Sequence, residues 1–119
     1  MAILVSVVMA VGIDLVEVAR IRHAMRSPRF VERILTAQER SRPLTASTVA
    51  GRWAAKEAVA KAIGLHLSWH QVEILGDEHG RPVAWVDDPH FDASRHRIHV
   101  SITHERTHAA AVAVLERTA

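Results

Sequence analysis

An alanine-rich stretch carries four charged side chains whose spacing could support metal or phosphate chemistry. Between Ala50 and Gly64 the charged residues are Arg52, Lys56, Glu57 and Lys61. The stretch reads as one helix, rich in alanine and long side chains and ended by a glycine. Glu57 and Lys61 are four residues apart and share a face, and Arg52 and Lys56 form a second such pair one step around. One carboxylate among three cations could hold a metal ion and a polyphosphate together, although an ordinary surface helix has the same pattern.

A second candidate carboxylate, Asp14, ends a valine-rich stretch. Val5 to Ile13 suits a buried first strand that ends near Gly12-Ile-Asp14. Asp14 is then expected to be the N-cap of a helix, with Glu17 at the capping-box spacing. Magnesium uses few protein carboxylates and completes its shell with water and phosphate oxygens. Asp14 and Glu57 could therefore form a magnesium site, whereas Asp14 alone would be only a cap.

Two other patterns suggest different functions. His104-Glu-Arg-Thr-His108 matches H-E-x-x-H, the pattern of zinc hydrolases, which requires a helix that places both histidines on one face. The residues just before it alternate like a strand, so this alternative is weak. The segment from Arg20 to Arg42 holds seven arginines against Glu32 and Glu39, a local charge of +5. Such a field suits a binder of acidic partners, or it is only a solvated helix face.

The remaining elements follow from local signals. A helix is expected from Asp14 to about Arg26. Further helices are expected after Ser27-Pro28 and after the capping box Thr36-Ala-Gln-Glu39, and the main helix is expected from about Thr48 to Ile63. Alternation predicts a hairpin of Val72–Ile74 and Val83–Trp85 around Gly76–Gly80, and a strand from Arg97 to Thr103 with Ile98, Val100 and Ile102 inward. His108 to Leu115 is either a buried strand or an apolar helix.

Composition limits the class of protein. The 119 residues suit a single domain, 1–119, and the 49% of apolar residues suits a globular core. The absence of cysteine argues against disulfides and fits a reducing cytoplasm. The apolar start from Met1 to Ala10 has no basic region and is too short for a membrane span. Nucleic acid is an unexpected partner, because the chain has no aromatic stacking platform and no glycine-rich phosphate loop.

The motifs together resemble one family. Gly12-Ile-Asp14, the segment Phe30 to Thr36 (Phe-Val-Glu-Arg-Ile-Leu-Thr), the segment Ala50 to Lys61 (Ala-Gly-Arg-Trp-Ala-Ala-Lys-Glu-Ala-Val-Ala-Lys) and the segment Val100 to His104 (Val-Ser-Ile-Thr-His) occur in this order in holo-[acyl-carrier-protein] synthases. These are the small trimeric 4′-phosphopantetheinyl transferases. The resemblance extends from about Val8 to Leu115. It implies an α+β fold with helices on an antiparallel sheet, and it demotes H-E-x-x-H to coincidence.

The resemblance also implies a reaction and its residues. Coenzyme A would donate 4′-phosphopantetheine to a serine of apo acyl carrier protein, leaving adenosine 3′,5′-bisphosphate. In this resemblance Asp14 and Glu57 match the magnesium ligands of the family, and Lys61 matches its lysine that contacts a phosphate of coenzyme A. Arg52 and His104 match positions near the nucleotide, at its 3′-phosphate, although His104 could be only a turn residue. Glu57, or a water held by it and the metal, would deprotonate the serine, and the sequence does not choose between them.

Partners follow from the same resemblance. Acyl carrier protein is strongly acidic, so the arginine-rich segment becomes its expected docking surface. The candidate contacts are Arg20, Arg26, Arg29 and Arg33, with Ile21, Met25 and Phe30 as the apolar part. A homotrimer is implied, with Asp14 and Glu57 from one chain and nucleotide contacts from a neighbour.

Overall fold

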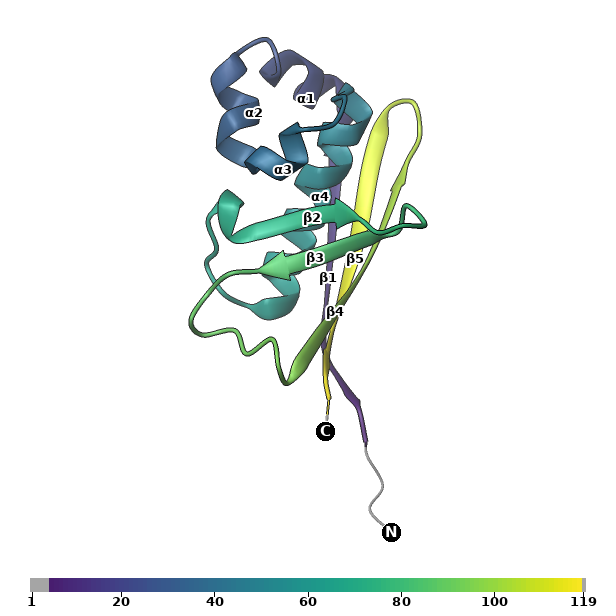
Figure 1. Ribbon diagram of the computed structural model, residues 1–119. Coiled ribbons are helices and arrows are strands. Elements are labelled where there is room, and N and C mark those ends of the chain that lie inside the picture. The colour runs from purple at the N-terminus through teal and green to yellow at the C-terminus, as the bar shows by residue number, and fades with distance from the viewer. Residues whose placement is uncertain (1–4, 119) are drawn as a thin grey trace.

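The core of the molecule is a three-stranded antiparallel sheet with one long helix on its face. The computed structural model describes residues 5–118, so residues 1–4 of the apolar start and residue 119 lie outside it. Strands β1 (Val7–Glu17), β5 (His108–Arg117) and β4 (His96–His104) lie in that order, with β5 in the middle. Helix α4 (Ala46–Ile63) packs on this sheet (Figure 1). The predicted α+β fold with helices on an antiparallel sheet is confirmed, while the single domain over 1–119 stays a prediction.

A separate hairpin crosses the long strands. Strands β2 (Val72–Gly76) and β3 (Pro82–Val86) form a two-stranded antiparallel sheet after a short 3₁₀ helix, η1 (Trp69–Gln71). The turn is closed by Asp77, whose carboxylate accepts hydrogen bonds from the backbone N–H groups of His79 and Arg81, both 2.8 Å long. The hairpin predicted from alternation is confirmed.

Three short helices gather at one end of α4 (Figure 1): α1 (Val18–Ala24), α2 (Pro28–Ile34) and α3 (Ala37–Arg40). Ser27 and Pro28 begin α2 as predicted. Helix α3 begins with the predicted capping box, and both of its hydrogen bonds are present: Thr36 Oγ1 accepts from Glu39 N, and Glu39 Oε1 accepts from Thr36 N. Helix α4 begins two residues before the expected Thr48, because Thr45 is its N-cap, and it ends at Gly64 in the left-handed conformation (φ 76°).

The predicted helix start at Asp14 is wrong. Strand β1 continues through Asp14 to Glu17, and α1 begins only at Val18. Antiparallel pairing explains the difference, because β5 matches β1 residue by residue from Asp14 opposite Ala111 to Glu17 opposite His108. This ladder satisfies the backbone groups that a cap would otherwise have to serve.

The last segment is strand β5 rather than a helix, and its alternation defines the two faces of the sheet. Ala109, Ala111, Ala113 and Leu115 are buried toward α4, whereas the residues between them are half-buried. In β4 the residues Ile98, Val100 and Ile102 face α4 and the residues between them are exposed, as predicted.

Helix α4 crosses the sheet obliquely. A methyl group on Gly51 would lie 3.0 Å from Cγ2 of Ile102 in β4, and one on Gly12 of β1 would lie 2.0 Å from the carbonyl oxygen of Ala58. The first half of α4 therefore packs near β4 and the second half near β1.

Among the described residues, no helix is both long and apolar enough to cross a membrane.

Candidate active site

The second half of α4 brings a lysine to the acidic end of β1. Asp14 shares the α4-facing side of β1 with Gly12, and its side chain is 16% exposed. Lys61 Nζ lies 3.3 Å from Asp14 Oδ1 and donates a 3.0 Å hydrogen bond to the carbonyl oxygen of Ile13. The structure thus joins two of the predicted residues, and the 54% exposed Lys61 side chain leaves its ammonium open to an anionic ligand.

Glu57 lies one turn before Lys61 on α4 and is half-buried. It lines a cavity of about 350 Å³ together with Lys56, His66, Ser68 and Trp69. Within residues 5–118 no group of three or more histidine or acidic side chains could hold a metal ion. A site with two carboxylates completed by substrate oxygens needs no such group. The convergence of Asp14 and Glu57 on one ion stays a prediction.

Arg52 and His104, both expected near a nucleotide, line another cavity together, and their role at a nucleotide stays a prediction. This cavity, which we call the α4–β2–β4 cavity, has a volume of about 310 Å³. Its other lining residues are Ser47, Thr48, Gly51, Ile74, Leu75, Gly76, Gly80, Pro82 and Ile102. The cavity is therefore walled by the first half of α4, the β2–β3 hairpin and the end of β4. It combines a guanidinium, an imidazole and two hydroxyl groups, which are suitable donors for a phosphate.

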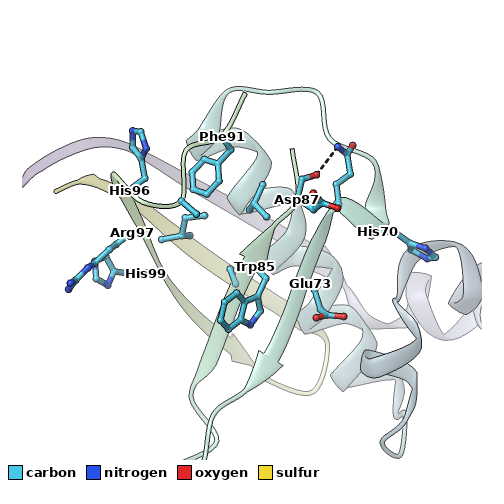
Figure 2. A pocket seen from close by; sticks show the side chains of 13 residues that line it. His70, Glu73, Trp85, Asp87, Phe91, His96, Arg97 and His99 are labelled. Atoms are coloured by element: carbon cyan, nitrogen blue, oxygen red, sulfur yellow. Dashed lines mark hydrogen bonds between the residues drawn. The ribbon is translucent and has the colours of Figure 1, made fainter. Parts of the chain in front are cut away.

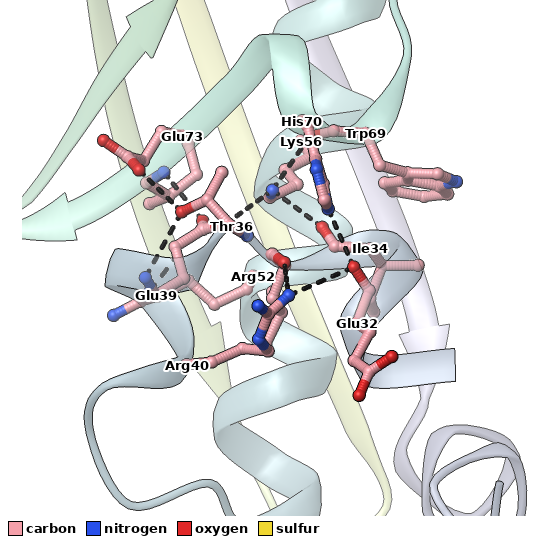
Figure 3. A network of polar contacts seen from close by, with 12 residues as sticks. Glu32, Ile34, Thr36, Glu39, Arg40, Arg52, Lys56, Trp69, His70 and Glu73 are labelled. Atoms are coloured by element: carbon pink, nitrogen blue, oxygen red, sulfur yellow. Dashed lines mark hydrogen bonds and ion pairs between the residues drawn. The ribbon is translucent and has the colours of Figure 1, made fainter. Parts of the chain in front are cut away.

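Lys56 is buried and lies apart from both Lys61 at Asp14 and the α4–β2–β4 cavity. Its side chain is 1% exposed, and its ammonium donates hydrogen bonds to Glu39 Oε1 at 2.7 Å, the Ile34 carbonyl at 2.8 Å and the Trp69 carbonyl at 3.0 Å (Figure 3). All three ammonium protons are therefore used. Lys56 is therefore not available to a polyphosphate, contrary to the expectation that Arg52, Lys56 and Lys61 act together around Glu57.

Glu39 is the centre of this buried cluster. Burial lowers the pKa of Lys56, and the Glu39 carboxylate opposes this shift. Burial likewise lowers the pKa of Arg52, which Glu39 raises and the nearby Arg42 lowers further. In the sequence Glu39 is recognisable only by its capping role, because no local pattern links it to α4.

The two histidines of H-E-x-x-H belong to a β-hairpin. His104 ends β4 and His108 begins β5, and the turn between them is held by Glu105, whose backbone N–H donates to the His108 carbonyl at 2.9 Å. The Glu105 carboxylate accepts from the backbone N–H groups of Thr107 and His108, at 2.8 and 2.7 Å. The helix that the zinc motif requires is absent from this described segment, so the zinc-hydrolase alternative is not supported.

Of the residues expected to contact the carrier, only the charged ones all lie on the surface, and docking there stays a prediction. Arg20, Arg26, Arg29 and Arg33 are exposed on α1, α2 and the turn between them. Ile21 and Phe30, expected as apolar contacts, are 2% and 8% exposed and belong to the core. They face inward because α1 and α2 are amphipathic helices whose apolar side packs on the rest of the molecule. Met25 is half-buried.

A further cavity contains none of the predicted residues. It has a volume of about 540 Å³ and lies between β3 and the first half of β4 (Figure 2). Trp85, Phe91, His96 and Arg97 contribute to its lining. His96 Nδ1 lies 2.8 Å from the Asp92 carbonyl, and its ring lies against Phe91 at 5.6 Å between centroids. These contacts explain the position of His96 structurally.

Comparison with known proteins agrees with the geometry. The model of the 4′-phosphopantetheinyl transferase superfamily matches residues 10–113. A holo-[acyl-carrier-protein] synthase of Anoxybacillus flavithermus is 44% identical, over 92% of this chain and 97% of the relative.

Two solved structures also match. One is a Bacillus anthracis holo-(acyl-carrier-protein) synthase in complex with CoA (3′,5′-ADP). It matches with a TM-score of 0.79 and 34% sequence identity, and the match covers 92% of this chain and 97% of that chain. The other is the Helicobacter pylori synthase in complex with coenzyme A: TM-score 0.80, 28% identity, 88% and 98% coverage. The chain therefore belongs to the 4′-phosphopantetheinyl transferase superfamily, among the holo-[acyl-carrier-protein] synthases, as its motifs predicted.

Proposed function

We propose that this enzyme transfers 4′-phosphopantetheine from coenzyme A to a serine of apo acyl carrier protein and releases adenosine 3′,5′-bisphosphate. The observation that carries the proposal is the meeting of Arg52 and His104 at the α4–β2–β4 cavity, in a chain of this family. Arg52 supplies a planar set of donors suited to a phosphate monoester, here the 3′-phosphate of the nucleotide. His104 adds a donor at the mouth of the same cavity.

The reaction exchanges one P–O bond for another. The serine oxygen attacks the phosphorus that bears pantetheine, and the bond from that phosphorus to the bridging oxygen of the diphosphate breaks. The bridging oxygen leaves with the nucleotide, and the serine proton passes to a base, for which Glu57 is the candidate. In such a transfer the protein mainly aligns the groups and neutralises charge. Lys61, held beside Asp14, is placed to contact the diphosphate.

The acidic residues of this region fit a magnesium ion. Asp14 offers a carboxylate that is little exposed and accessible from one side, and Glu57 would supply a second; hard oxygen ligands of this kind are those that magnesium prefers. When bound, magnesium would neutralise charge on the diphosphate oxygens. Lys61 Nζ lies 3.3 Å from Asp14 Oδ1, so its ammonium would add positive charge beside the residue that would hold the ion.

The acidic carrier would dock on the arginines of α1 and α2. Arg20, Arg26, Arg29 and Arg33 are exposed there and form a surface of one sign. Charge complementarity of this kind raises the encounter rate and fixes orientation more than it adds affinity. Since Ile21 and Phe30 are buried, the contact would be chiefly electrostatic, with Met25 as the apolar residue.

We also propose that the enzyme assembles as a homotrimer. The face of β1 that points away from α4 presents Val11, Ile13 and Leu15 at 61–67% exposure, an apolar stripe of the kind that marks an interface. Arg52 and Lys61 are nine residues apart on α4, about 13 Å along the helix, and point toward opposite edges of the sheet. A neighbouring protomer could bring its cavity to the Asp14 side of this one.

We also propose a cytoplasmic location, which is expected from the lack of cysteine.

One assay tests the reaction. The chain is mixed with apo acyl carrier protein, coenzyme A and magnesium, and the carrier mass and the released nucleotide are followed by mass spectrometry. The expected result is a carrier heavier by one phosphopantetheine and one equivalent of adenosine 3′,5′-bisphosphate. If the reaction depends on magnesium, a chelator should abolish the transfer, and added magnesium but not zinc should restore it. An unmodified carrier under all of these conditions would refute the proposal.

A further inference from the structure

Glu39 is a buried carboxylate that links three elements around the α4–β2–β4 cavity. It is 1% exposed, although a lone buried carboxylate is strongly unfavourable. Its Oε1 atom accepts hydrogen bonds from Thr36 N at 2.8 Å and Lys56 Nζ at 2.7 Å. Its Oε2 atom accepts from the backbone N–H of Ile74 at 2.9 Å. The carboxylate thus joins α3, α4 and β2.

The same carboxylate faces the arginine of the cavity. Arg52 Nη1 lies 3.9 Å from Glu39 Oε2, and the Arg52 side chain is 16% exposed (Figure 3). At this distance the pair is an ion pair rather than a direct hydrogen bond. Glu39 therefore faces the guanidinium without accepting a hydrogen bond from it, so the Arg52 donors stay available to an anion in the cavity.

The charges around Glu39 leave a positive excess on the cavity side. One carboxylate faces the ammonium of Lys56 and the guanidinium of Arg52, and Arg42 is close enough to lower the pKa of Arg52. Lys56 is enclosed by its three acceptors, so the charge available to a ligand is that of Arg52. Glu39 also accepts a hydrogen bond from the backbone N–H of Ile74, a β2 residue that lines the same cavity, so one carboxylate contacts both α4 and β2 there.

We propose that Glu39 is a positioning residue for substrate recognition. It orients Arg52 and sets the spacing of α4 and β2, so that the cavity distinguishes a nucleotide that bears a 3′-phosphate from one that lacks it. This inference rests on the proposed nucleotide site. It makes a prediction opposite in sign to a simple charge effect, because removal of a negative charge beside Arg52 would by itself strengthen phosphate binding.

The test compares binding of coenzyme A and 3′-dephospho-coenzyme A by calorimetry. Arg52→Ala is expected to lower the preference for coenzyme A by roughly tenfold or more, since a hydrogen bond to a charged group is lost. Glu39→Gln is expected to lower the same preference by roughly three- to tenfold, with dephospho-coenzyme A affected less. Glu73→Gln is the matched control, because Glu73 accepts a hydrogen bond from Thr36 Oγ1 in the same network and is not within ion-pair distance of Arg52. Its preference should equal that of the wild type.

The outcomes separate the two proposals. If the wild type does not prefer coenzyme A, or Arg52→Ala keeps the preference, the nucleotide site itself is wrong. If Arg52→Ala loses the preference while Glu39→Gln retains or increases it, only the positioning role is overturned. An equal loss of affinity for both ligands in Glu39→Gln would show a merely structural role and would also overturn it. Should circular dichroism show that Glu39→Gln is unfolded, Glu39→Asp carries the same test, because it keeps the charge for Lys56 and draws the carboxylate back from Arg52.

Discussion

Replacement of Gly12 by alanine should separate β1 from α4. At Gly12 the strand backbone lies close against the helix backbone. A Cβ atom there would lie 2.0 Å from the carbonyl oxygen of Ala58 and 2.9 Å from the backbone nitrogen of Ala62. Both are backbone atoms of a helix whose neighbouring side chains are fully buried, so no flexible group can move aside.

The cost can be worked out from this geometry. Because real Cβ atoms do not approach within 3.0 Å of other heavy atoms, the helix must move by about 1 Å. A gap of that size removes up to about half of the dispersion energy of each contact across it. Overpacking costs about 1–3 kcal/mol, and contact with backbone places this case near 3 kcal/mol. For a domain of this length, that lowers the melting temperature by roughly 12 °C.

The assay is urea and thermal unfolding at equal protomer concentration, since assembly would itself raise the apparent stability. Gly76→Ala is the matched control, because its new methyl would have its nearest neighbour at 3.8 Å, an ordinary contact. Its stability should stay within about 1 kcal/mol of the wild type. If Gly12→Ala lost less than about 1 kcal/mol, the tight β1–α4 packing that brings Lys61 to Asp14 would be refuted.

Three further perturbations test other parts of the molecule. Arg20→Glu should reduce kcat/KM for the carrier protein by roughly tenfold at low salt and leave coenzyme A affinity unchanged. The control Arg95→Glu, at another exposed arginine, should change neither quantity. An equal effect of Arg20→Glu on both substrates would disprove docking at α1. Ile13→Glu places a charge on the exposed stripe of β1 and should yield monomers in sedimentation, and a wild-type chain that is itself monomeric would contradict the assembly. Hydrogen bonds, chiefly from the Thr107 hydroxyl, hold the pKa of Glu105 below its ordinary value of 4.5 in the folded state. The ionised carboxylate therefore stabilises the folded state above that pH, and this stabilisation is lost as the pH falls through the lowered pKa. Glu105→Gln should therefore make the free energy of unfolding less dependent on pH between about 5 and 3, and identical slopes would argue against this role.

Local signals in the sequence predicted those features whose partners are near in the chain. The Thr36–Glu39 capping box, the end of α4 at Gly64 and the hairpin around Gly76–Gly80 each depend on a few consecutive residues, and each is present. The apolar alternation of β4 was equally readable, because a strand with one buried face has a period of two.

Features set by distant partners could not be predicted in the same way. Asp14 looks like a helix cap from its neighbours, yet β5, nearly a hundred residues away, extends the strand past it. The alanine-rich β5 is compatible with either structure until it is placed between β1 and β4. Ile21 and Phe30 were read as surface contacts because amphipathicity identifies an apolar side without saying what it packs against.

Glu39 shows how one residue carries a local and a distant role together. Its spacing from Thr36 reveals the cap, whereas its ion pair with Lys56 spans 17 residues and leaves no pattern in the sequence. The helix period accounts for the rest: successive residues point about 100° apart, so Lys56 turns to Glu39 while Glu57 follows on another side. The four charged residues of α4 therefore lie in different surroundings: Lys56 is in the buried cluster, Arg52 lines the α4–β2–β4 cavity, Glu57 lines the cavity beside Trp69, and Lys61 contacts Asp14 of β1. If the proposed homotrimer brings Arg52 of one protomer to Lys61 of the next, mixed oligomers of Arg52→Ala and Lys61→Ala chains should recover part of the activity that each variant lacks alone, and mixtures with no activity would argue against a site shared between protomers.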